Sequence, residues 1–239
     1  SCLMSIDKTL LKEKTIKSDK MHSKFNCSAT LGFTLAEVLV TLGIIGVVSA
    51  MTIPTLVKNH QRQVYVTQLQ KVYAELNQAF ESALTDNNAV SLRESKVFGR
   101  DGSARNFFDR YFKVIKNCEG NDLDGCFVAE YENLNGETYR LRNYITSDCD
   151  CAVIASGAAM CIHFIPAENV AYIDVDINGK QGPNIVGRDM FQLVVRNERI
   201  ISASQDSLNN FGTNAPSSAI GDYGLFLTKI QNDGWKMDY

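Results

Sequence analysis

The stretch with the clearest capacity for chemistry is DVDINGKQGPNIVGRD, residues 174–189. Aspartate and asparagine alternate at its start ahead of a glycine, an order that matches the opening of an EF-hand calcium loop. Ile185 stands where such a loop places its closing glutamate. The candidate calcium ligands are Asp174, Asp176, Asn178, the carbonyl of Lys180, and Asp189. Two interpretations stay open: a structural calcium ion that braces the loop, or a hairpin turn whose Asp and Asn side chains bond their own backbone.

The histidines give no positive case for catalysis. His22, His60 and His163 lie in the leader, in a helix and in a predicted strand, and none belongs to an HExxH pair. The sequence also contains no phosphate-binding GxxxxGK[ST] loop and no nucleophile elbow. We therefore expect a protein that is not an enzyme and that requires no cofactor.

Five cysteines follow residue 100: Cys118, Cys126, Cys149, Cys151 and Cys161. We expect two disulfides, because these residues lie in the part of the chain predicted to be exported. Cys118–Cys126 forms one candidate loop, and Cys161 can pair with either Cys149 or Cys151. A soft-metal site at the DCDC stretch is the alternative, but it lacks a CxxC partner or a nearby histidine cluster.

Charge is divided unevenly along the chain. Residues 1–32 contain six lysines and three acidic residues, whereas the remainder contains 18 basic and 24 acidic residues. An acidic main body lacks the broad basic surface of a nucleic-acid-binding protein. No nucleic-acid partner is predicted.

Residues 33–57 form an apolar segment in which Glu37 is the only charged residue. Its 25 residues are enough to cross a bilayer and too many for the apolar core of a signal peptide. The preceding lysines place the N-terminus in the cytoplasm, so that everything after Val57 is exported. A carboxylate in this setting is energetically unfavourable unless it has a partner.

Beyond the span, apolar residues recur at steps of three and four from Leu69 to Ala83, which predicts that one helix of about 50 residues continues to the Asp86-Asn87-Asn88 stop. Pro54 should kink it. A second helix is predicted over Ser103–Lys116, capped by Ser103. Strands are predicted over Glu137–Ile145, Ala159–Ile165, Val170–Ile177 and Met190–Arg196, with a hairpin at Asn197-Glu198, a loop over 203–222, and a C-terminal GWKMDY that closes the sheet with Trp235 buried.

The residues around the span carry a family resemblance. Gly32, Phe33, Thr34, Leu35, Glu37, Gly46 and Pro54 occur in the order and spacing of the type IV pilin and type II secretion pseudopilin family. The chain resembles that family strongly over about 25 residues. The rest is more loosely similar, through NGKQGPNIVGRDMF and DGWKMDY, to pilin-like proteins associated with type II secretion in bacteria. Leu31 replaces the basic residue that often precedes the glycine, and a start at Met21 would give a leader of more usual length.

The resemblance implies a processing site and an assembly surface. A membrane-embedded prepilin peptidase would cut between Gly32 and Phe33 and methylate the new amine of Phe33. Glu37 would pair with the amine of an adjacent subunit and set its axial register. Gly43 and Gly46 would let neighbouring helices approach closely.

The implied fold is α+β and type IV pilin-like, with a long N-terminal helix packed on an antiparallel sheet. The expected parts are a cleaved leader (1–32), a transmembrane and assembly segment (33–57), an amphipathic segment (58–85) and an exported head (86–239). The implied function is that of a structural subunit of a type II secretion pseudopilus or a type IV pilus-like filament in the bacterial inner membrane. Its partners would be other pilin-like subunits, the prepilin peptidase, the inner-membrane assembly platform and the bilayer. The alternative is a minor pilin whose head acts as a membrane-anchored adhesin or other binding module.

Overall fold

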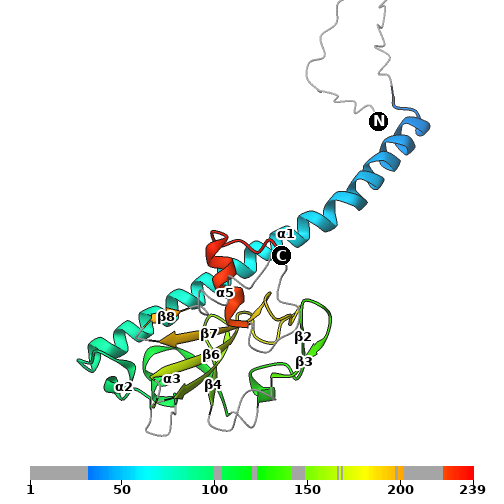
Figure 1. The fold of residues 1–239 in the computed structure, drawn as a ribbon. Coiled ribbons are helices and arrows are strands. Elements are labelled where there is room, and N and C mark those ends of the chain that lie inside the picture. The colour runs from blue at the N-terminus through cyan, green and yellow to red at the C-terminus, as the bar shows by residue number, and fades with distance from the viewer. Residues whose placement is uncertain are drawn as a thin grey trace, which may run out of the picture. The chain divides into compact units, whose positions relative to one another are not determined.

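The computed structural model describes residues 32–98, 104–119, 123–141, 149–165, 167, 169–196, 199–201 and 223–239 (Figure 1). The chain divides into two units, one ending at Ser49 and the other running from Ala50 to Tyr239, and the second unit is an α+β domain. The elements are α1 (Leu35–Asp86), α2 (Leu92–Ser95), α3 (Arg105–Tyr111), β1 (Val114–Glu119), η1 (Leu123–Gly125), β2 (Tyr131–Glu132), β3 (Thr138–Tyr139), β4 (Asp150–Ile154), β5 (Ala159–Ile165), β6 (Val170–Asp176), β7 (Met190–Arg196), β8 (Arg199–Ile201) and α5 (Tyr223–Asn232).

The long helix α1 is continuous over 52 residues, which confirms the prediction of a single helix with Pro54 inside it. Its second half buries a stripe spaced by three and four residues: Val66, Leu69, Val72, Leu76, Ala79, Phe80 and Ala83. The helix ends at the predicted stop, where Asn88 adopts a left-handed φ of 48° and the amide of Ala89 bonds the carbonyl of Leu84 at 2.9 Å. Burial of each large apolar side chain in this stripe contributes about 1.5–3 kcal/mol.

Six strands form one antiparallel sheet in the order β1-β4-β5-β6-β7-β8, and β2 and β3 pair separately. The predicted strands at β5 and β7 match their observed bounds, and β6 ends one residue earlier than predicted. The predicted hairpin is present, since Arg196 pairs with Arg199 across β7 and β8. Its turn residues, 197 and 198, lie outside the described residues.

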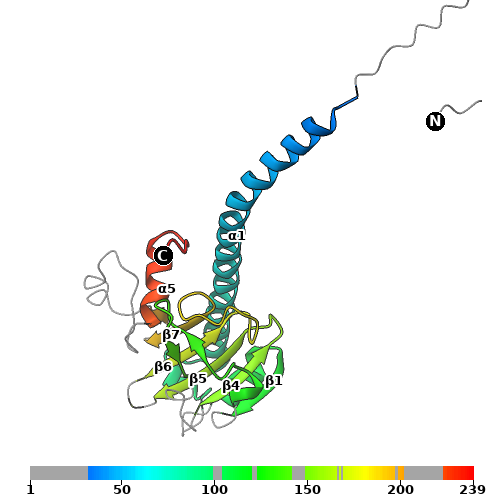
Figure 2. The same ribbon diagram turned by 90° about the vertical axis from the view of Figure 1, so that its right-hand side faces the viewer.

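The second half of α1 lies along one face of the sheet (Figures 1 and 2). A run of aromatic rings joins the helix to β5: Phe80 stacks on Phe107 at 4.8 Å, Phe107 lies 5.2 Å from Phe98, and Phe98 stacks on Phe164 at 4.6 Å between ring centroids. All four rings are buried, and Phe107 has no exposed surface. This aromatic run is the centre of the core between helix and sheet.

The predicted helix over Ser103–Lys116 is too long. Only Arg105–Tyr111 is helical, and the chain is in strand β1 from Val114 onward, because pairing with β4 satisfies its backbone groups. Ser103 lies outside the described residues. The first amides of α3 are instead bound by a strand residue: the carboxylate of Asp150 accepts from the amides of Ala104 at 2.7 Å and Arg105 at 3.1 Å.

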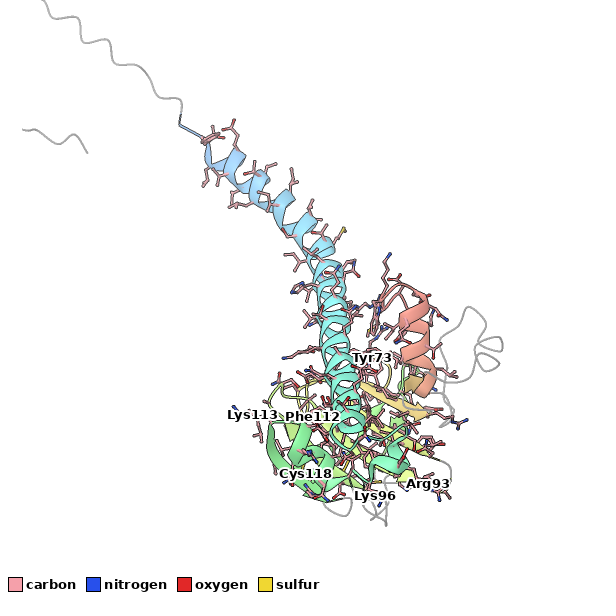
Figure 3. All side chains as sticks on the ribbon, turned by 90° about the vertical axis from the view of Figure 1, so that its left-hand side faces the viewer. Tyr73, Arg93, Lys96, Phe112, Lys113 and Cys118 are labelled. Carbon is pink, nitrogen blue, oxygen red and sulfur yellow. A yellow bond between two sulfur atoms is a disulfide. The ribbon has the colours of Figure 1, made fainter. Side chains whose placement is uncertain are left out.

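Three further differences concern the ends of the head. The strand predicted over Glu137–Ile145 is only two residues long where it is described, Thr138–Tyr139, and 142–148 lie outside the described residues. The helix α5 was not predicted, and the whole of the expected loop over 203–222 lies outside the described residues. The C-terminal residues after α5 do not form a strand, so the prediction that they close the sheet is wrong. Trp235 is half-buried, and its ring lies edge to face against that of Tyr73 of α1, with 5.7 Å between the ring centroids. Figure 3 labels Tyr73.

Replacing Phe107 tests the aromatic run. Phe107→Ala should lower the free energy of unfolding by about 3–5 kcal/mol, because it empties a fully enclosed site between α1 and β5. Thermal or chemical denaturation of the whole chain in detergent, followed by circular dichroism, measures the change. Val90→Ala is the control, because Val90 is 83% exposed and its truncation should change stability by less than about 0.5 kcal/mol.

Candidate functional site

The start of α1 carries a reciprocal pair of hydrogen bonds. The carboxylate of Glu37 accepts from the backbone amide of Thr34 at 2.8 Å, and the hydroxyl of Thr34 accepts from the backbone amide of Glu37 at 3.2 Å. Thr34 precedes the first helical residue, Leu35, so this arrangement is a capping box. It satisfies two amides that the first helical turn would otherwise leave without acceptors.

The capping box fixes where the Glu37 charge lies. The carboxylate is held at the first turn of the helix, where the macrodipole favours a negative charge. Its partner Thr34 directly follows Phe33, which is 86% exposed. Sequence reasoning placed Thr34 in the family motif but missed this contact, although the T-x-x-E spacing at the start of an apolar run is its signature.

The first half of α1 is an apolar surface that no other described residue buries. The most apolar 18-residue window of the helix has a mean hydropathy of 2.0 and contains no buried residue. Leu39, Ile44, Val47 and Met51 are between 59% and 74% exposed. By length and composition, α1 is a helix that can cross a membrane.

Gly43 and Gly46 lie within this apolar surface, and no other part of the described chain requires glycine there. A Cβ atom added at either position meets no heavy atom within 4 Å. Glycine in a helix interior is less favourable than alanine by roughly 1 kcal/mol. The two glycines therefore weaken α1 without serving a close contact inside this molecule.

The second candidate region is a buried polar cluster in the head. The carboxylate of Asp176, at the end of β6, accepts from the hydroxyl of Tyr131 at 2.7 Å and from the amide of Asn178 at 3.2 Å. The carboxylate of Asp189 accepts from the amides of Asn184 at 2.7 Å and Ile185 at 2.6 Å. Both carboxylates are fully buried, and they brace the two ends of the loop between β6 and β7.

Burial controls the protonation of this cluster. It raises the pKa of Asp176 to about 8, and the hydroxyl of Tyr131 offsets only part of that rise. Burial likewise raises the pKa of Asp189, against the effect of the two amides that bind it. The negative charge of Asp189 adds to the rise at Asp176, so the two side chains disfavour ionisation of each other.

The predicted calcium ligands do not all join this cluster. Asp174 accepts from Gln192 of the neighbouring strand β7 at 3.1 Å, and Lys180 uses its ammonium group to bond the carbonyl of Asp124. Within the described ranges, no three His, Cys, Asp or Glu side chains are grouped as a metal site. The contacts of Asp176 and Asn178 are those of the hairpin-turn interpretation, in which side chains bond the backbone of their own loop.

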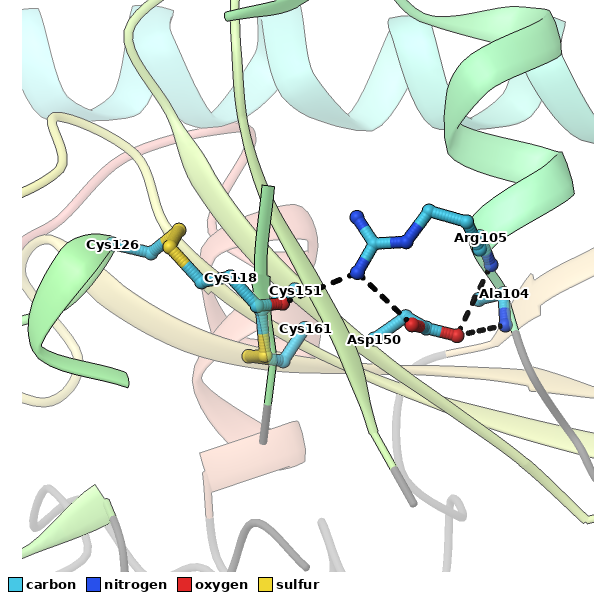
Figure 4. Close-up of polar contacts among 7 residues, drawn as sticks. All are labelled: Ala104, Arg105, Cys118, Cys126, Asp150, Cys151 and Cys161. Atoms are coloured by element: carbon cyan, nitrogen blue, oxygen red, sulfur yellow. Dashed lines mark hydrogen bonds and ion pairs between the residues drawn. A yellow bond between two sulfur atoms is a disulfide. The ribbon is translucent and has the colours of Figure 1, made fainter. Parts of the chain in front are cut away.

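Two disulfides are present, Cys118–Cys126 and Cys151–Cys161 (Figure 4). The first was predicted, and for the second the structure selects Cys151 over Cys149, which is buried and belongs to neither bridge. Sheet register explains the choice, because Cys151 lies directly opposite Cys161 on paired strands. Cys118 lies opposite Cys151 on its other side, so both bridges share one row of the sheet.

The same region holds the charged pair that anchors α3. Arg105 donates to the carboxylate of Asp150 at 3.1 Å and to the carbonyl of Cys118 at 3.5 Å (Figure 4). The disulfide row, β1 and the start of α3 are thus tied together by one residue of β4.

Comparison with known proteins gives one match. The model of DUF6613, a family of unknown function, matches residues 55–214, which is more than half of the chain. This chain belongs to the DUF6613 family. No curated protein and no solved structure matches it. The region matched to DUF6613 begins just after Pro54 and includes the core stripe of α1, both disulfides and the Asp176–Asp189 loop. Gly32, Phe33, Glu37 and the glycines of the apolar surface lie before it.

The buried carboxylates of this DUF6613 protein predict an unusual pH dependence. Between about pH 4 and about pH 8 the unfolded chain releases a proton that folded Asp176 retains, so stability should fall as pH rises through this window. Asp176→Asn removes that titration and should reduce the loss of Tm from pH 5 to pH 8 by at least about 2–4 °C, the shift that 1 kcal/mol causes in a domain of this size.

Thermal melts across that pH range, compared with the exposed-site control Asp238→Asn, measure the effect. An Asp176→Asn variant with the same pH slope as the control would contradict the raised pKa.

Proposed function

We propose that this chain is a pseudopilin-like structural subunit that is anchored in the bacterial inner membrane and assembles into a type II secretion pseudopilus or a type IV pilus-like filament. The supporting observation is the Glu37 carboxylate, held by Thr34 at the start of a helix whose apolar first half contains no buried residue among the described ones. A capping box is served by Gln as well as by Glu, so capping alone gives no reason for a charge in an apolar span.

Charge balance explains why processing and assembly belong together. A single carboxylate at the centre of a bilayer is unfavourable by roughly 2.5–3.5 kcal/mol on insertion scales, and pairing with a cation reduces this. Cleavage between Gly32 and Phe33 creates an ammonium group on Phe33, the residue before the amide that Glu37 already binds. The carboxylate can then accept from that ammonium in its own chain or from the ammonium of a neighbouring subunit, which gives growing filaments an axial register.

Helix packing in the filament supplies the missing reason for Gly43 and Gly46. Neither glycine has a close neighbour in the single chain, and each reduces helix propensity. Between packed apolar helices, small residues let backbones approach closely and gain van der Waals contact. Copies of this chain and related subunits are the partners that the exposed half of α1 fits.

The head is compatible with this assignment. A long helix lying on an antiparallel sheet has the layout of a pilin-like subunit, and its two disulfides suit an exported compartment. The prepilin peptidase and the inner-membrane assembly platform complete the proposed set of partners. Head and apolar helix together support the proposal of a structural component.

Mass spectrometry of the mature N-terminus tests the processing step. Protein from cells with an active prepilin peptidase should begin at Phe33 and carry one methyl group on its amine. Cells without the peptidase should yield the uncut chain. An intact Gly32–Phe33 bond in the presence of the active peptidase would contradict the proposal.

Glu37 tests assembly separately from processing. Glu37→Val should insert and be cleaved normally but reduce the yield of sheared filaments by about tenfold or more, equivalent to the loss of about 1.4 kcal/mol per contact. Glu81→Val is the matched control, because Glu81 is exposed on the second half of α1. Quantitative blotting of membrane and filament fractions measures both variants, and a normal filament yield from Glu37→Val would contradict a role in register.

A further inference from the structure

A polar groove lies at the end of the head where the exposed half of α1 begins. It has a volume of about 440 Å³ and is formed by α1 together with the C-terminal residues that follow α5. The residues that matter for recognition are Asn59, Arg62, Gln63, Trp235, Lys236 and Asp238. The ring of Trp235 lies edge to face against that of Tyr73, which Figure 3 labels on α1. This contact holds the C-terminal residues of the groove against the helix.

Positive charge dominates this groove. Arg62 and Lys236 line it, and Lys58 lies one helical turn before Arg62 on the same helix. Burial, and after it the positive charge of Arg62, lower the pKa of Arg188, so the charge of Arg188 adds to that of the groove. Asp238 is the only carboxylate among the residues that line the groove.

These cations lack the partners that other cations of the head have. Arg105, Arg110 and Lys229 each have a carboxylate within 3.2 Å. Arg62 and Lys236 form no ion pair with any described residue. Arg188 bonds the backbone oxygen of Tyr239 and lies 4.9 Å from the centre of its ring. Asp238 offsets one of the two positive charges that line the groove, so the lining keeps a net positive charge.

The distance of the groove from the apolar segment along α1 matches the distance of lipid phosphates from the hydrocarbon core. Ile53, Leu56 and Val57 are exposed apolar residues of the helix just before it. At 1.5 Å per residue, Arg62 lies about 7.5 Å beyond Val57 along the helix. The headgroup region outside the hydrocarbon core is about 5–7.5 Å thick on each side, and Trp235 is the residue type that concentrates there.

We propose that this groove binds the phosphate of an anionic phospholipid headgroup. The guanidinium of Arg62 can donate two parallel hydrogen bonds to phosphate oxygens, Lys236 adds a second charge, and the amides of Asn59 and Gln63 reach the glycerol of the headgroup. Binding would fix the depth and rotation of the head at the membrane surface. The inference rests on the proposed membrane anchoring of α1.

Lipid retention by the full chain tests the site. Wild-type protein is reconstituted in nanodiscs that contain phosphatidylcholine with a minor share of phosphatidylglycerol, and bound lipids are counted by native mass spectrometry after release. Wild type should retain phosphatidylglycerol in excess of its share. Arg62→Gln combined with Lys236→Gln should reduce that excess by about tenfold, equivalent to about 1.4 kcal/mol, because the two cations that would bind the phosphate are removed.

A charge-matched control separates the groove from general electrostatics. Arg93→Gln combined with Lys96→Gln removes two exposed cations at the opposite end of the head (Figure 3) and should leave the excess unchanged. Equal loss in the two double variants, or no loss in the groove variant, would overturn the inference. Saturation of the detergent-solubilised wild type by millimolar inorganic phosphate alone would assign the groove to free phosphate and would overturn it too.

Vesicle flotation tests the membrane anchoring by α1 separately from the lipid site in the groove. Both double variants should float with phosphatidylcholine vesicles as wild type does, because α1 alone holds them in the bilayer. Wild type that does not float would contradict the membrane anchoring itself. Flotation without a groove-dependent excess would contradict only the lipid site.

Discussion

The contact on which the head depends is the stripe of apolar side chains along the second half of α1. A helix buries a stripe only if the facing surface is apolar and continuous, and here that surface is one face of the sheet together with the rings of Phe98, Phe107 and Phe164. Leu69, Leu76 and Phe80 have almost no exposed surface, so the helix and the sheet each complete the core of the other. A stable head without this part of α1 would expose the centre of its own core.

The apolar residues in the first half of the same helix are exposed, and the proposed role of the chain depends on this exposure. Apolar residues that remain exposed over several turns are unfavourable in water and favourable in hydrocarbon, so a bilayer or a bundle of like helices must cover them. The capping box at Thr34 and Glu37 starts the helix without help from any partner. It also leaves one charge at the edge of the apolar surface, where the proposed cleavage before Phe33 would supply an ammonium group to pair with it.

Polar groups inside the head are used mainly to hold loops and element ends. Asp150 binds the first amides of α3 and the guanidinium of Arg105, while Asp189 binds two amides of the loop between β6 and β7. Burial of a carboxylate is unfavourable even where such donors bind it, and it raises the pKa of both Asp176 and Asp189. The disulfide row beside Asp150 fixes the β1 and β4 edge in the same way by covalent means.

The sequence by itself determined the features that repeat along the chain or depend on near neighbours. Helix α1, its end near Asn88, strands β5 and β7, the hairpin of β7 and β8, and the Cys118–Cys126 bridge all follow from periodicity, turn residues or short separation. The apolar span with its single acid was equally clear, because composition alone shows it.

Tertiary structure decided whatever depends on residues far apart in sequence. Val114–Glu119 is a strand and not the end of α3 because β4 is available to pair with it, and the first amides of α3 are bound by Asp150 from 45 residues away. Register chose Cys151 over Cys149, and packing against α1 kept Trp235 out of the sheet. Local propensity contains none of this information, because each of these choices compares the free energies of contacts that exist only after the chain has folded.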